Sequence, residues 1–245
     1  MTTFQTYLHS FFFSAYPYIC MVVFLVGSLA RFDRDQYTWK SDSSQLLRTG
    51  TLRWGSNLFH VGILFLFFGH FFGLLTPHSV YEPFISASHK QLLAVISGGT
   101  AGFLCFVGLS LLIWRRMFDP RIRLTSHRTD LAILIILWVQ LSLGLATLPL
   151  SLSHLDGIVM LLLADWAQRV FTFRVGGAEG LIGLAWPFKV HLVLGMTIFL
   201  LFPFSRLVHV WSGFAAVAYL FRPYQVVRSR RLNVPAGHDQ ERARV

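Results

Sequence analysis

Four histidines lie within stretches of sequence that are too apolar to face water: His60, His70, His191 and His209. The other six histidines fall in loops or at the ends of apolar stretches. An unpaired imidazole in hydrocarbon costs on the order of several kcal/mol, so a histidine inside a membrane span indicates a function or a hydrogen bond between helices. One such histidine would leave both interpretations open, whereas four on two spans favour a functional site.

The order of the spans predicts how these histidines pair. The second and fifth apolar stretches are three membrane crossings apart, so they must run antiparallel. His60, early in the second stretch, can therefore meet only His209, late in the fifth, and His70 then meets His191. Two neutral imidazoles that face one another are the axial ligands of a b-type haem held between helices. We predict two haem b groups (protohaem IX) per chain, and one-electron transfer as their chemistry, because both axial positions of each iron are filled.

The two spacings do not match on ideal helices. The ten-residue step in the second stretch rises about 15 Å, and the eighteen-residue step in the fifth rises about 27 Å. Tilted haems, crossed helices or a kink at Pro203 would absorb the difference. Several glycines would let a flat macrocycle approach the backbone, although close helix packing explains them equally well. These glycines are Gly62, Gly69, Gly73 and Gly195.

The composition requires membrane helices to carry these residues. The 245 residues are 54% hydrophobic and 13% charged, which excludes a soluble enzyme and a disordered chain, and also a soluble nucleic-acid binder despite the net charge of +10. Cys20 and Cys105 form no CxxC, CxxCH or zinc-type spacing. Neither a thiolate metal site nor a covalently attached c-type haem is therefore expected.

The fold class follows from five apolar stretches, each long enough for a helix to cross a hydrocarbon core of about 30 Å. We predict an all-α integral membrane bundle of five transmembrane helices. Residues 1–225 would form the five-helix transmembrane cytochrome b domain, and residues 226–245 a basic cytoplasmic tail. The predicted spans are about 5–30, 54–76, 91–114, 130–150 and 186–211.

The basic residues predict the orientation of the bundle. Seventeen of the 21 lysines and arginines follow the first, third or fifth span. The positive-inside rule then places the N-terminus outside and the C-terminus in the cytoplasm. No basic residue precedes the first span, so we do not expect a cleaved signal peptide. The longest outer loop contains an apolar stretch, Ile158 to Phe173, with Asp165 and Arg169 at i, i+4, which predicts a helix lying in the interface.

Several short motifs carry a resemblance to a known family. They include Gln36-Tyr37-Thr38-Trp39, Ser56-Asn57-Leu58-Phe59-His60, Gly69-His70-Phe71-Phe72-Gly73, His191-Leu192-Val193-Leu194-Gly195-Met196 and Phe202-Pro203-Phe204-Ser205-Arg206-Leu207-Val208-His209. In order and spacing, from about residue 10 to about residue 230, the chain resembles the gamma subunit of the membrane-bound respiratory nitrate reductase. The longer C-terminal tail, Leu232 to Val245, departs from the family pattern and stays unassigned.

The resemblance implies roles for individual residues. In the family, a proximal haem is bound by residues that match His60 and His209, and a distal haem by residues that match His70 and His191. A quinol site beside the distal haem involves residues that match Gly69, His70 and Lys90. Without the family, an interfacial anchor is the first explanation of Lys90.

The resemblance also implies partners and a location. They are an iron–sulfur beta subunit, a molybdenum-containing alpha subunit that reduces nitrate, and the bacterial inner membrane. Quinol would be oxidised near the periplasmic side, and its electrons would pass through the two haems to the iron–sulfur subunit in the cytoplasm. No residue of this chain is expected to catalyse nitrate reduction itself.

Rival functions fit less well. A histidine-lined proton or metal transporter would usually add Asp or Glu within the spans, together with broken helices around a midplane site. A di-iron membrane desaturase needs dense histidine boxes, and the sequence has none. The b subunit of a hydrogenase or formate dehydrogenase is the nearest alternative, and the motifs above speak against it.

Overall fold

The computed structural model describes residues 3–34 and 50–211. Five of its helices are long and apolar enough to cross a membrane: Thr3–Arg34, Leu52–Leu75, Ala87–Phe118, Arg128–Leu152 and Trp186–Phe204. The prediction of an all-helical protein with five spans is therefore confirmed. The predicted boundary between residues 225 and 226 lies outside the described residues.

The spans are built from a small number of elements. The first comprises α1 (Thr3–Ser10), a π-helical turn η1 (Phe11–Ala15) and α2 (Tyr16–Arg34). The next three are α3 (Gly50–Leu75), α5 (Ala87–Phe118) and α7 (Arg128–Leu152), and the fifth begins with α9 (Trp186–Leu201). The shorter elements are α4 (His78–Tyr81), α6 (Pro120–Thr125), α8 (Ile158–Phe171) and the 3₁₀ turns η3 (Glu179–Leu181), η4 (Phe202–Phe204) and η5 (Arg206–Val208).

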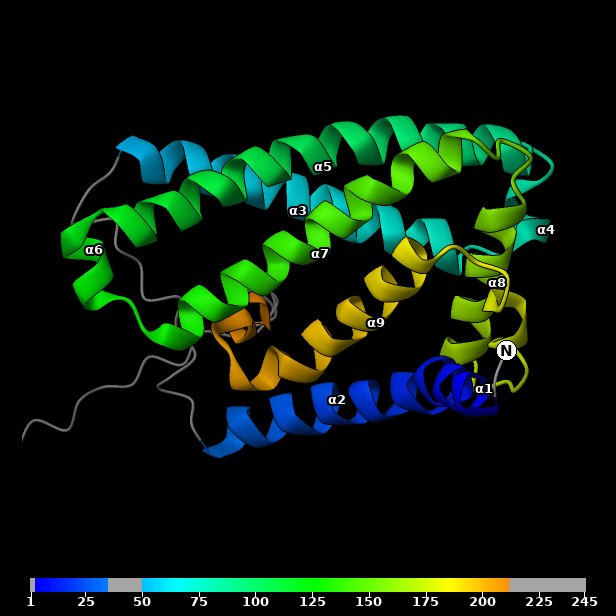
Figure 1. The fold of residues 1–245 in the computed structure, drawn as a ribbon, viewed down its shortest axis with the longest axis horizontal. Helices are drawn as coiled ribbons and strands as arrows, with labels where there is room; N and C mark the ends of the chain where they lie inside the picture. The colour runs from blue at the N-terminus through cyan, green and yellow to red at the C-terminus, as the bar shows by residue number, and fades with distance from the viewer. Residues whose placement is uncertain (1–2, 35–49, 212–245) are drawn as a thin grey trace, which may run out of the picture. The chain divides into compact units, whose positions relative to one another are not determined.

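The helices pack in an open series (Figure 1). Helix α3 packs on α5, α5 on α7, α7 on α9, and α9 on α2. Glycines bring α3 and α5 together, because a Cβ at Gly62 would lie 2.6 Å from the Cβ of Cys105, and one at Gly108 would lie 2.4 Å from the backbone nitrogen of Phe59. Helices α3 and α9, which carry three of the four histidines, are not among the closely packed pairs. The histidines of α3 and α9 therefore face one another across a gap that is wider than the separation between directly packed helices such as α3 and α5.

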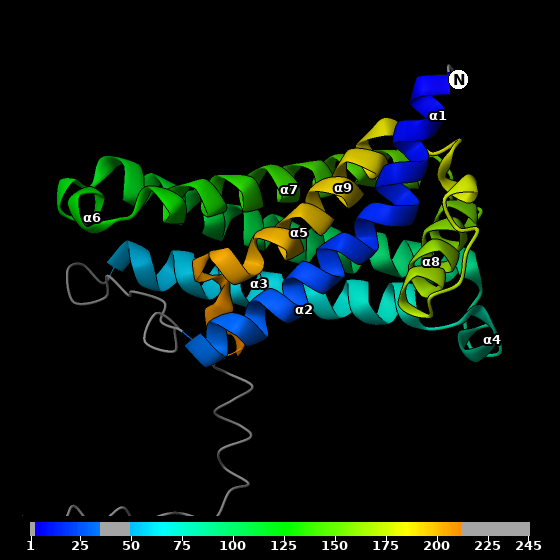
Figure 2. The same ribbon diagram turned by 90° about the horizontal axis from the view of Figure 1, so that it is seen from below.

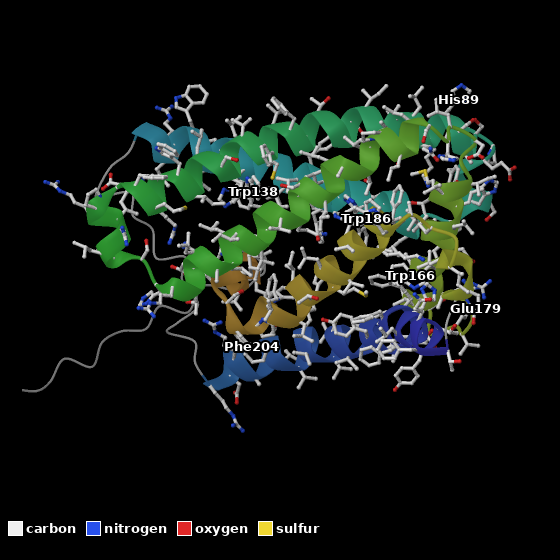
Figure 3. All side chains as sticks on the ribbon, in the orientation of Figure 1. His89, Trp138, Trp166, Glu179, Trp186 and Phe204 are labelled. Atoms are coloured by element: carbon white, nitrogen blue, oxygen red, sulfur yellow. The ribbon has the colours of Figure 1, made fainter. Side chains whose placement is uncertain are left out.

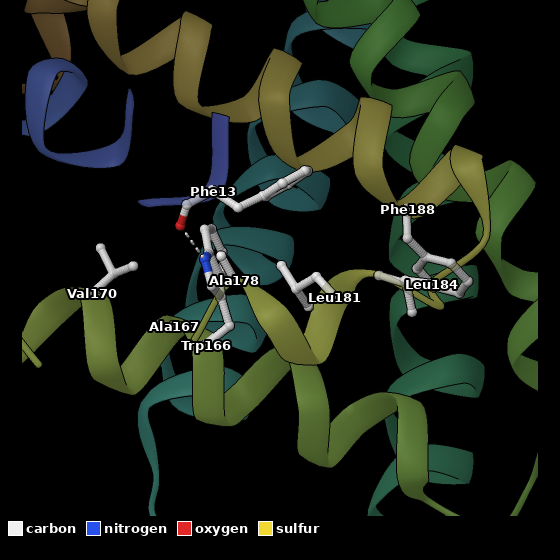
Figure 4. Packing of buried hydrophobic residues seen from close by; sticks show 8 residues of the cluster. All are labelled: Phe13, Trp166, Ala167, Val170, Ala178, Leu181, Leu184 and Phe188. Carbon is white, nitrogen blue, oxygen red and sulfur yellow. Dashed lines mark hydrogen bonds between the residues drawn. The ribbon is translucent and has the colours of Figure 1, made fainter. Parts of the chain in front are cut away.

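Helix α8 lies across one end of the spans, at the same end as α4, whereas α6 lies at the other end (Figure 2). This is the predicted interfacial helix, and Arg169 Nε donates to Asp165 Oδ2 at 2.8 Å. The ion pair raises the pKa of the Arg169 guanidinium. Buried apolar residues join α8 to η1, η3 and α9 (Figure 4). Among them, the Trp166 indole donates to the Phe13 carbonyl at 2.9 Å, which satisfies a carbonyl of the π-helical turn.

The side-chain amides of two glutamines cap the C-terminal ends of two spans near α8. The Gln168 amide donates to the carbonyls of Leu74, at 3.0 Å, and Thr76, at 3.3 Å, where α3 ends. The Gln91 amide donates to the carbonyls of Ser151, at 2.8 Å, and His154, at 2.7 Å, where α7 ends. Terminal carbonyls have no partner within their own helix, so these amides stabilise the ends of two spans.

The fifth span, which the sequence predicts as 186–211 with a kink at Pro203 left open, is not one regular α-helix. Regular α-helix ends at Leu201, and Phe204, labelled in Figure 3, lies in the 3₁₀ turn that follows. Proline at 203 supplies no backbone N–H, and Ser205 is extended at φ −119° and ψ 175°. Arg31 Nη1 donates to the carbonyls of Pro203, at 2.6 Å, and Ser205, at 2.9 Å. The cation from α2 thereby satisfies carbonyls at the break.

Candidate electron-transfer site

The structure brings the four intramembrane histidines together in two pairs. The ring centroids of His60 and His209 are 6.4 Å apart, and those of His70 and His191 are 6.3 Å apart. Helix α3 supplies one member of each pair. The chain from His191 to His209 is not one straight helix, because two 3₁₀ turns and an extended residue follow Leu201. The straight-helix rise of about 27 Å therefore does not apply to this pair of histidines.

Hydrogen bonds define the tautomer of all four imidazoles. In each ring, Nδ1 lies within hydrogen-bond distance of a backbone carbonyl, which can only accept. The acceptors are Ser56 for His60, Leu66 for His70 and Arg206 for His209, each at 2.7 Å, and Gln140 for His191, at 3.0 Å. The proton therefore sits on Nδ1, and Nε2 keeps the lone pair that binds a metal.

The spacing of each pair fits a metal ion between the rings. Two metal–nitrogen bonds of about 2 Å, with about 1 Å from each nitrogen to its ring centre, give about 6 Å between centroids. Among the described residues, no group of three or more His, Cys, Asp or Glu side chains could hold a metal ion by itself. Two axial imidazoles without further protein ligands suit a haem, whose macrocycle supplies the other four donors.

The exposed side of α3 has room for such a group. His60 and His70 are exposed, although both lie within a membrane span, and His191 and His209 are only partly buried. Apart from its chain neighbours and the backbone of its own helix, Gly69 has nothing within 4 Å of where its Cβ would be, and the same holds for Gly73. Gly62, by contrast, faces α5, so helix packing explains it.

Lys90 lies close to the outer histidine pair. Its Nζ donates to the Gly73 carbonyl at 3.0 Å and lies 3.6 Å from the ring centroid of Tyr81. Gly73 is one turn beyond Gly69 and close to His70 in α3, so the three residues that the resemblance assigns to quinol binding share one region of the structure. Tyr81 is buried, which raises the pKa of its phenol.

Two residues beside the site were not identified from the sequence. Tyr81 contacts the Lys90 ammonium, and Gln140 contacts the ring and backbone of His191. Gln140 had a detectable signal, since it is an amide within an otherwise apolar span. Tyr81 had none, because an aromatic residue at the end of a span is ordinary.

The fold and the paired imidazoles define a class: helical membrane proteins with two bis-histidine sites between their spans. A model of the family described as nitrate reductase gamma subunit matches residues 9–230. The chain belongs to this family, which is one of membrane-bound cytochromes b.

Individual relatives match over nearly their whole length. The respiratory nitrate reductase 1 gamma chain of Escherichia coli (strain K12) is 52% identical over 224 residues, which cover 91% of this chain and 99% of the relative. The respiratory nitrate reductase 2 gamma chain of the same strain is 53% identical over 226 residues, 92% of this chain and 99% of the relative. The nitrate reductase gamma chain of Bacillus subtilis (strain 168) is 36% identical over 215 residues, 87% and 95% of the respective chains.

Proposed function

We propose that this gamma subunit binds one haem b between His60 and His209 and a second between His70 and His191, and so acts as the quinol-oxidising subunit of a respiratory nitrate reductase in the bacterial inner membrane. The observation that carries the proposal is the pair of centroid distances, 6.4 and 6.3 Å, between imidazoles whose proton on Nδ1 leaves a lone pair on Nε2. When bound, the haems supply one-electron transfer between the two sides of the membrane.

The chain's own residues provide for quinol oxidation at the outer pair. The Lys90 ammonium can donate a hydrogen bond to a quinol oxygen and lower the cost of the anion formed as the quinol loses a proton. Its present partners, the Gly73 carbonyl and the Tyr81 ring, hold it beside α3. The open space at Gly69 and Gly73 would admit a planar head group. These contacts support a quinol site formed by Gly69, His70 and Lys90.

The opposite end of the bundle is suited to soluble partners. Exposed basic side chains gather around α6, at Arg121, Arg123 and Arg128. Asp130 links the neighbouring elements, because Arg116 Nη1 donates to its Oδ2 at 3.4 Å and Arg206 Nη1 donates to the same oxygen at 3.3 Å. This basic surface, whose elements are linked by ion pairs at Asp130, would bind the iron–sulfur beta subunit, which in turn would bind the molybdenum-containing alpha subunit.

Single histidine variants of the membrane complex test the ligand assignment. We expect His60→Ala or His209→Ala to remove the inner haem, and His70→Ala or His191→Ala to disturb the outer one, because each variant removes one of the two imidazoles that would hold that haem. Redox titration of the b-haem absorbance would resolve two components in the unsubstituted complex and identify the one lost. His89→Ala is a matched control, because His89 is exposed and bonds locally to Ser86. Loss of the same component from variants in different pairs would contradict the pairing.

A further inference from the structure

We infer that Gln140 is a positioning residue for the outer histidine pair, which holds the imidazole of His191 from a neighbouring helix. The inference rests on the proposed role of His191 as a haem ligand. It concerns the orientation and electronic environment of that ligand rather than its presence.

The contact between these two residues is reciprocal. His191 Nδ1 donates to the main-chain carbonyl of Gln140 at 3.0 Å, and the Gln140 side-chain amide donates to the main-chain carbonyl of His191 at 3.1 Å. The same amide nitrogen lies 3.4 Å from His191 Nε2, the nitrogen that would bind iron. Iron would take the lone pair that this amide faces, so the bonds to the two main-chain carbonyls are the ones that could remain in the haem-bound protein.

Only one of the four histidines is held in this way. The rings of His60, His70 and His209 each bond to a carbonyl three or four residues earlier in their own segment of chain. The carbonyl that holds His191 belongs to α7, which is separated from it by 51 residues. The orientation of this ring therefore depends on how α7 packs against α9.

Two glycines make room for the contact. A Cβ at Gly144, one turn after Gln140, would lie 2.9 Å from Cε1 of His191. A Cβ at Gly195, one turn after His191, would lie 3.0 Å from the Gln140 amide nitrogen. Neither glycine has the left-handed backbone that would require the residue for its conformation. The absence of a side chain explains both positions.

The hydrogen-bonding capacity of the Gln140 side chain is only partly used. Its side-chain oxygen is buried and has no hydrogen-bond partner among the described residues. A buried polar atom without a partner is unfavourable, and an apolar side chain of similar volume would avoid that cost. The position of the amide beside the ligand accounts for the glutamine instead.

The expected effect is on the properties of the outer haem. The hydrogen bond at Nδ1 and the orientation of the ring determine how strongly an axial imidazole donates to iron. Two hydrogen bonds hold α7 against His191, one from His191 Nδ1 and one from the Gln140 amide. Loss of the amide removes the second bond, so we expect both the plane of the imidazole ring and the bond at Nδ1 to change.

The test uses the assembled nitrate reductase in membranes. Gln140→Met keeps the length of the side chain and removes the amide, whereas Gly195→Ala keeps the amide and displaces it. Ser142→Ala is the matched control, because Ser142 lies two residues further along α7 and its hydroxyl donates within the helix, to the Trp138 carbonyl at 2.8 Å. Haem content, the electron paramagnetic resonance spectrum of the ferric haems and a redox titration are measured for each variant.

We expect both Gln140→Met and Gly195→Ala to retain two haems per chain while the low-spin signal and the midpoint potential of the outer haem shift. The inner haem and the Ser142→Ala variant should match the unsubstituted protein. An unchanged outer signal in Gln140→Met, or equal shifts of both haems, would overturn the inference. If the unsubstituted complex shows no outer haem signal, the ligand assignment itself is wrong, which distinguishes that failure from the first.

Discussion

The Lys90 ammonium shows how one side chain can serve a reaction near the end of a membrane span. It reaches across from α5 to the Gly73 carbonyl of α3 and lies against the Tyr81 ring. A lysine that served only as an interfacial anchor would extend toward the head groups. The observed position, on the carbonyl of the residue three places after His70 in α3, instead favours a role in binding a polar group near the outer pair.

Replacing this lysine tests that role. We expect Lys90→Ala to slow haem reduction by quinol about 10-fold or more, because a hydrogen bond from a charged donor contributes about 1.5–3 kcal/mol. Both haems should remain bound and reducible by dithionite. Stopped-flow absorbance measures the rate. Lys189→Ala is the control, because Lys189 lies on the side that the basic residues predict to be outside but donates to the Ile182 carbonyl at 2.6 Å. A normal rate for Lys90→Ala with unchanged haem content would reject the assignment.

Among the elements, the contact between α3 and α5 determines where the inner histidine lies. Gly108 of α5 faces the backbone nitrogen of Phe59, the residue before His60, and the opposing Gly55 carbonyl would lie 2.8 Å from a Cβ at Gly108. Backbone atoms cannot move aside as a flexible side chain can. The position of His60 therefore depends on the absence of a side chain at Gly108, which lets α5 approach the backbone of α3.

Gly108→Ala tests this condition. We expect it to destabilise the protein by about 1–3 kcal/mol, the usual cost of overpacking, and to weaken binding of the inner haem before the outer one. Thermal unfolding in detergent and a haem titration report the two effects. Gly98→Ala, on the same helix, has no atom within 4 Å of the added Cβ and should leave both properties unchanged. Similar losses in the two variants would show that the close contact at Gly108 does not matter.

The sequence predicts some contacts of the site but not others. Apolar stretches and their order were enough to pair His60 with His209 and His70 with His191, because antiparallel spans leave one arrangement. The sequence does not reveal the bond from His191 to Gln140, since that depends on how α7 is rotated about its axis against α9. The irregular segment after Leu201 was predicted only as a kink at Pro203, because the extended conformation of Ser205 is established through Arg31 of another span.

At the scale of the whole molecule, the distribution of charge connects the site to energy conservation. Quinol oxidation at the outer pair would release protons outside, and electrons would move toward the basic cytoplasmic end. Moving one negative charge fully across against a membrane that is negative inside stores about 2.3 kcal/mol per 100 mV. The direction of this movement depends on the orientation inferred from the basic residues.

A reporter fusion tests the orientation. Seventeen of the 21 basic residues follow the first, third or fifth span, so we expect a reporter placed after Val245 to be active only in its cytoplasmic form. A fusion in the loop after Gly176, between α8 and η3, provides the matched outer position. A periplasmic signal from the C-terminal fusion would reverse the proton and electron directions given above.

The number of haems per chain tests the central claim most directly. A pyridine haemochrome assay on the purified complex, normalised to the gamma subunit by quantitative amino-acid analysis, measures non-covalent haem b. Two imidazole pairs, with ring centroids 6.4 and 6.3 Å apart, predict two haems b per chain. One haem, or none, in the intact complex would contradict the account.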